Sequence, residues 1–180
     1  AEQYASLPTN EKAEYEANQG AMFAFDGKIY VDEAALVQYI NGTAPELRQE
    51  KIKAALREEV IHIATMNVRD SKQISEDWNM LPDEAKRRVI ETYFTSELEQ
   101  AGGDWTQVEV PAFNAGAEFW RMYLNAVTEG RTTEQVDLLT EVAEYAKTNP
   151  SFAARIKEAL EDIARWLREE LLGNLDPDAR

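Results

Sequence analysis

The chain has no cysteine, a single histidine and far fewer basic than acidic residues. Without cysteine it cannot form disulfides, use a thiolate nucleophile or bind zinc through sulfur, which fits a reducing compartment. Its 19 Lys and Arg residues face 34 Asp and Glu residues, giving a net charge of −15. This excess disfavours binding to nucleic acid or to an anionic membrane. A solvated acidic surface is the simplest interpretation, and a basic partner or a bound cation is the alternative.

Long apolar runs are also missing from the sequence. No stretch approaches the 18 or so apolar residues that a membrane span needs, and no basic-then-apolar segment suggests a signal peptide. No Gly-x-Ser-x-Gly elbow or phosphate-binding loop is present. Since the sequence has no membrane span, no signal peptide and no cysteine, we expect a cytoplasmic protein. The first residue is Ala and the last five are Asp-Pro-Asp-Ala-Arg, so we expect a processed product or a piece of a longer polypeptide.

The 180 residues, 44% of them apolar, are enough for one domain with a sizeable core. Two β-prone runs flank Asp26-Gly27 and predict a small hairpin. The rest predicts helices, so the expected fold class is mainly α (α+β), with one hairpin before a central helix. We expect three segments: a polar N-terminal stretch (1–20), a helical domain (21–148) and a C-terminal amphipathic helix (149–180) packed on that domain or extending from it.

Helical periodicity and capping signals predict most of the elements. A capping box at 43–46 opens the central helix, which should run to about Val68. The residues at 104–111 suit a short strand or an extended loop. The other expected helices are 9–18, a short one ending at Ile40 after Asp32, one around 75–80, 83–100, 112–128, one that starts at Thr132 or Thr133 and ends before Asn149, and 150–172. In the helix at 112–128 we expect Phe119, Met122, Tyr123 and Val127 to face inward.

The central helix carries an acidic residue on its apolar side. At about 100° per residue, Glu59 falls inside the apolar arc, His62 at its edge and Glu58 just beyond it. A carboxylate there carries a desolvation cost unless a proton, a partner or a metal relieves it. The ordinary interpretation is that Glu59 pairs with His62, or with an Arg of another helix.

The spacing of these residues also suits a metal site. Glu58 and His62 lie one turn apart on one face, where both can reach a single cation. The run Glu-Glu-Val-Ile-His resembles the HExxH motif of zinc proteases with its first His replaced by Glu. Together with a preceding strand, Glu-Phe-Trp-Arg-Met at 118–122 and Gly-Arg-Thr-Thr-Glu at 130–134, it resembles zincin-like metallopeptidase domains of long phage-encoded polypeptides.

The resemblance covers about residues 20–135 and implies specific roles. Glu58 and His62 would be metal ligands, Glu59 the base that activates a metal-bound water, and Glu118 the third ligand, with Glu91 as second choice. One imidazole with two carboxylates is harder than His-His-Glu, so the metal would be zinc or a harder ion such as manganese. The chain would act on a peptide or protein, or be an inactive relic, in a host cytoplasm or a virion.

Two other interpretations stay open. Glu59 and His62 match half of a di-iron Glu-x-x-His motif, which needs a second histidine that this chain lacks. The second of these interpretations is that the chain is a noncatalytic acidic helical interaction module, such as a phage structural protein or an inhibitor that binds a basic partner. In that case a protein partner could bind through the C-terminal helix.

Overall fold

A computed structural model of the chain describes residues 22–25, 28–42, 44–128 and 133–172, so the helix predicted at 9–18 lies outside it. The described backbone is mostly helical, which confirms the mainly α class. It divides into two compact units, one ending at Ile63 and the other beginning at Ala64. The segment boundaries predicted after residues 20 and 148 stay predictions. None of the described helices is long and apolar enough to cross a membrane.

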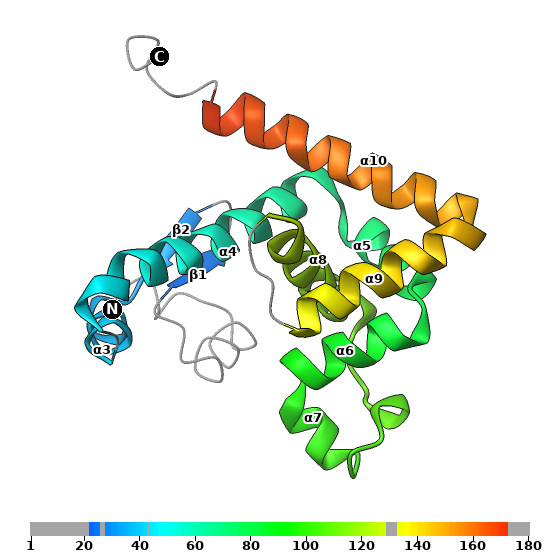
Figure 1. Ribbon diagram of the computed structural model, residues 1–180, viewed down its shortest axis with the longest axis horizontal. Coiled ribbons are helices and arrows are strands. Elements are labelled where there is room, and N and C mark those ends of the chain that lie inside the picture. The colour runs from blue at the N-terminus through cyan, green and yellow to red at the C-terminus, as the bar shows by residue number, and fades with distance from the viewer. Residues whose placement is uncertain (1–21, 26–27, 43, 129–132, 173–180) are drawn as a thin grey trace. The chain divides into compact units, whose positions relative to one another are not determined.

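The first unit contains a strand pair and a short helix (Figure 1). Strands β1 (Met22–Phe25) and β2 (Lys28–Val31) pair antiparallel, with Met22 opposite Val31. Helix α3 (Glu33–Asn41) follows directly. Its first turn is capped as the sequence predicts, because the backbone N–H of Ala35 donates to Asp32 Oδ1 at 2.8 Å.

The central helix begins with a 3₁₀ turn. This turn, η1, covers Pro45–Leu47, and α4 continues over Arg48–Val68. Ala44, at the N-cap of η1, has no side-chain group that could cap it, and no such hydrogen bond is made. Thr43 lies outside the described residues, so the capping box predicted there stays a prediction. The boundary between the two units falls within α4, after Ile63.

The second unit is built from helices joined by short connections. After the end of α4 come α5 (Ser71–Met80), α6 (Asp83–Tyr93), α7 (Thr95–Gln100), the 3₁₀ turn η2 (Trp105–Gln107), α8 (Ala112–Thr128), α9 (Thr133–Thr148), α10 (Pro150–Trp166) and the π-helical segment η3 (Leu167–Leu172). Pro150 takes the first position of α10, where its missing N–H costs nothing.

Two predicted helices were wrong in extent. Helix α5 begins four residues earlier than expected, because Asp70 and Gln73 form a reciprocal capping box. The single helix predicted over 83–100 is broken at Phe94, whose backbone (φ −122°, ψ 44°) is not helical. Of the two alternatives given for 104–111, the strand does not form: a 3₁₀ turn at 105–107 is followed by irregular backbone over 108–111. The glycine pair at 102–103, with positive φ at both residues, ends α7 as predicted.

Helix α8 is the centre of the second unit. It contacts α5, α6 and α9, and Figure 1 shows it running among them. Its buried side chains include Phe119 and Met122, as their spacing predicts, and also Trp120. Val127, also expected to face inward, is instead 47% exposed in the last turn of α8.

Helices α5 and α8 approach each other closely at Gly116. A Cβ added to this glycine would lie 2.5 Å from the carbonyl oxygen of Ile74 and 2.9 Å from its Cγ2 atom. Because the first of these atoms belongs to the backbone, the two helices would have to separate. The glycine is therefore required by the packing.

We predict that Gly116→Ala lowers the free energy of unfolding by about 2 kcal/mol or more, despite the better helix propensity of alanine, because overpacking forces backbone shifts. Urea unfolding followed by circular dichroism measures the change. The matched control is Asn114→Ala on the exposed face of the same helix, which should change stability by less than about 0.5 kcal/mol. A Gly116→Ala protein as stable as the parent would contradict the close contact.

Candidate functional site

The residues that resemble a metal-binding motif lie on α4. The helix is continuous through 58–62, so Glu58 and His62 are four residues apart on one helix, as predicted. Glu59 and His62 are half-buried. The side chain of Glu58 lies outside the described residues. The helix thus supplies the predicted backbone spacing for two ligands on one face.

The candidates for a third ligand lie in the second unit. Glu118, on α8, has a side chain 13% exposed and lies 3.5 Å from Nη1 of Arg121. Glu91, on α6, is about half exposed and lies 3.8 Å from Nη1 of Arg87. Since a carboxylate has two oxygens, an ion pair between one of them and a guanidinium does not by itself prevent metal binding.

The predicted ligand set is therefore divided between the two units. Glu58, Glu59 and His62 belong to the first, and both candidates for the third ligand to the second. Among the described side chains, no three of the His, Asp and Glu residues come together in a group that could hold a metal ion. The complete set, with Glu118 or Glu91, stays a prediction.

The second unit contains a buried carboxylate that the sequence interpretation did not single out. Asp77, on α5, is almost fully buried and accepts hydrogen bonds from three side chains. Arg69 holds it with two parallel bonds, Nε to Oδ2 at 2.6 Å and Nη2 to Oδ1 at 2.8 Å. The indole Nε1 of Trp120 donates to Oδ2 at 2.9 Å. We call Arg69, Asp77, Trp120 and Arg155 the Asp77 network.

Arg155 connects α10 to this network. Its Nε donates to Asp77 Oδ1, and its Nη2 donates to the carbonyl of Gln73 at 3.1 Å and to Glu76 Oε2 at 2.9 Å. Burial acts to lower the pKa of Arg155, but the hydrogen bonds and charges of Asp77 and Glu76 outweigh it and raise that pKa. Two guanidinium groups thus face two carboxylates, so the cluster is balanced in charge.

The signal for this network was present in the sequence. Asp77 lies three residues after the buried Ile74 and four before the buried Leu81, on the apolar stripe of α5. Arg155 occupies the same kind of place between Phe152 and Ala159 on α10. Asp77 and Arg155 are both charged residues on the apolar side of a helix. The same observation singled out Glu59 on the central helix. Applied to every helix, that argument would have found them.

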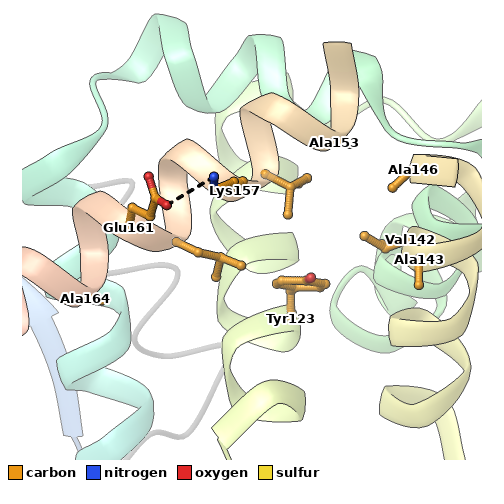
Figure 2. A pocket seen from close by; sticks show the side chains of 10 residues that line it. Tyr123, Val142, Ala143, Ala146, Ala153, Lys157, Glu161 and Ala164 are labelled. Atoms are coloured by element: carbon orange, nitrogen blue, oxygen red, sulfur yellow. Dashed lines mark ion pairs between the residues drawn. The ribbon is translucent and has the colours of Figure 1, made fainter. Parts of the chain in front are cut away.

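An apolar groove lies in the same unit, between α9 and α10, with Tyr123 of α8 in its floor (Figure 2). Its volume is about 360 Å³. Burial raises the pKa of the Tyr123 hydroxyl. The ring of Tyr123 packs edge-on against Trp120, with centroids 5.9 Å apart. The lining residues are Tyr123, Val142, Ala143, Ala146, Ala153, Ile156, Lys157, Leu160, Glu161 and Ala164.

Comparisons of the chain with protein-family models, with curated proteins and with solved structures found no match. The function has to be inferred from the residues and their arrangement alone.

We predict that Asp77→Asn lowers the free energy of unfolding by about 3–5 kcal/mol, because it leaves the guanidinium groups of Arg69 and Arg155 without their shared buried counter-charge. Equilibrium urea unfolding provides the value. The control is Glu76→Gln, which removes a carboxylate that is 44% exposed and should cost less than about 1 kcal/mol. Equal losses in the two variants would show that the Asp77 network does not hold the unit together.

Proposed function

We propose that the chain is a noncatalytic acidic helical interaction module that binds a basic protein partner. The supporting observation is how charge is distributed in the second unit. Residues 64–180 include 23 acidic and 13 basic residues. Eleven of the basic ones lie in the part that the structure describes, and nine of these are within 4 Å of a carboxylate. Positive charge is mostly neutralised locally, and the excess is carboxylate.

Part of that excess gathers around α7 and η2, in a sequence stretch (89–120) with six acidic residues and no Lys or Arg. We call Glu97, Glu99, Asp104 and Glu109 the acidic edge. All four are exposed, and none forms an ion pair with a Lys or Arg in the described ranges. Hydrogen bonds from the hydroxyl and the backbone N–H of Thr106 lower the pKa of Asp104, so this side chain is ionised at neutral pH.

A surface of this kind suits recognition of a basic protein. Carboxylates without local counter-ions create a negative potential that raises the association rate of a cationic partner. Since the groups are exposed, the attraction is screened within about 8 Å at physiological ionic strength. Binding should therefore weaken as salt rises.

We predict that a flexible 16-residue peptide of lysine, glycine and serine binds the full chain and that raising NaCl from 50 to 300 mM weakens binding at least tenfold, as expected for several screened contacts. Fluorescence anisotropy of the labelled peptide measures the Kd. The triple variant Glu97→Gln, Glu99→Gln, Glu109→Gln should weaken binding at low salt by about fivefold or more.

The matched control removes the same charge from the first unit, with Glu33→Gln, Glu46→Gln and Glu50→Gln, all at exposed positions. It should change the Kd by less than the acidic-edge variant. Equal weakening would show that only net charge matters, and absence of peptide binding at 50 mM NaCl would refute the interaction module.

A second candidate is a metal-dependent hydrolase-like domain, active or relic, of the zincin-like type. The unbroken course of α4 through its motif supports it. In this proposal Glu58, His62 and Glu118 bind zinc or manganese, Glu59 is the base, and β2 is the strand that precedes the motif helix. The substrate would be a peptide or protein, in a host cytoplasm or a virion. A divalent ion there would lower the pKa of a bound water.

For this candidate we predict a stoichiometric divalent metal in protein purified without a polyhistidine tag, measured by plasma mass spectrometry. His62→Ala should lose the metal, whereas Glu59→Gln should keep it and reduce peptide hydrolysis about 100-fold or more, as loss of a general base does. Should no metal co-purify or bind on addition of zinc or manganese, with His62→Ala altering only stability, the hydrolase proposal fails.

A further inference from the structure

The groove between α9 and α10 has the shape of a site for an elongated ligand. Its α10 wall runs from Ala153 to Ala164, about three turns or 17 Å of helix. Four of its lining residues are alanines, two on each helix, so both backbones stand close to the groove. Figure 2 shows Tyr123 between the two walls, where its ring forms the floor.

The walls are held in place without a ligand. Arg155, on the α10 wall, is bound to Asp77 and to the carbonyl of Gln73. The ring of Tyr145 on α9 packs against Phe152 on α10, with centroids 5.0 Å apart. A preformed groove needs little reorganisation on binding, which favours affinity.

A helix is the occupant that this shape fits best. Two neighbouring helices with small side chains between them accept the apolar stripe of a third, with anchors spaced i, i+3, i+4 and i+7. Leu160, which is partly exposed, would contact those anchors from α10, together with the small part of Ile156 that is still exposed. Burial of the exposed apolar part of the lining, and of the apolar stripe of the bound helix, supplies the driving force.

The charges of the chain indicate that the bound helix is basic. Lys157 and Glu161, both exposed, are the charged residues that line the groove, and their side chains lie 3.6 Å apart on successive turns. Such an exposed ion pair contributes little to stability, so a cation from a partner can replace Lys157. The net charge of −15 repels a second copy of this chain and attracts a basic one.

We propose that the groove between α9 and α10 binds a basic amphipathic helix, with apolar residues against Ile156 and Leu160 and a Lys or Arg at Glu161. This rests on the proposed function, since it takes the partner to be a basic protein. It goes further by naming the surface and the structure of the bound segment. It also gives opposite roles to the two charged residues of the groove.

The test uses an 18-residue amphipathic peptide of leucine, alanine and lysine, and the full chain. Ala153→Leu fills the groove and should weaken binding at least tenfold, whereas the control Ala154→Leu, exposed on the same helix and outside the groove, should leave the Kd within twofold. Glu161→Gln should weaken binding about twofold, and Lys157→Gln should strengthen it by a similar factor.

The outcomes separate this inference from the proposed function. If the helical peptide binds equally to the Ala153→Leu and Ala154→Leu proteins, the groove is not its site, although the flexible lysine peptide can still bind. If a peptide with glutamate in place of lysine binds more tightly, the partner is not basic. If Lys157→Gln and Glu161→Gln both abolish a concentration-dependent dimer seen by sedimentation, the groove binds a second copy and the proposal is wrong.

Discussion

The second unit depends on the carboxylate of Asp77 lying between two guanidinium groups and an indole. Each bond joins a different part of the chain to α5: the end of α4 through Arg69, α8 through Trp120 and α10 through Arg155. Burying a lone carboxylate costs several kcal/mol, and these partners offset that cost only when all the elements are in place. The interaction therefore favours one arrangement of helices over others that apolar packing alone would allow.

The same interaction positions the surface to which we assign partner binding. Trp120, held by Asp77, packs against Tyr123, which forms the floor of the groove. Arg155, held by the same carboxylate, lies on α10 one residue before Ile156, which lines the groove. The floor and the α10 wall are therefore both tied to Asp77, whereas the α9 wall is tied to α10 by the packing of Tyr145 against Phe152. A site formed in this way resembles a preorganised binding surface more than a flexible one.

The sequence predicted the parts of the fold that depend on local signals. These signals act through hydrogen bonds or dihedral angles within a few residues. Examples are Asp32 at the start of α3, Pro150 at the start of α10 and the glycines after α7. It failed at Phe94, where the apolar period continues but the backbone turns. Periodicity records which side is buried and says little about where a helix bends.

The buried network shows a second limit. Each member could be recognised as a polar residue at a core position, but Arg155 is 78 residues from Asp77 in sequence. No local rule indicates which buried charges will meet. For Glu59 the sequence interpretation chose a metal from several partners that a buried carboxylate can have. Asp77 shows that, in this chain, arginine is one of them.

The distribution of charge also bears on which proposal explains more. The buried carboxylate of Asp77 is neutralised by two arginines at short range, so the described interior of the second unit carries little net charge. Apart from Asp77, the described carboxylates of this unit are at least partly exposed, and four of them, the acidic edge, lie within a stretch without Lys or Arg, which solubility alone would not require. A metal site on α4 would use at most three of the 34 acidic residues. Recognition of a basic partner would use the excess of acidic over basic residues. For this reason the interaction module explains the composition of the chain better than the hydrolase does.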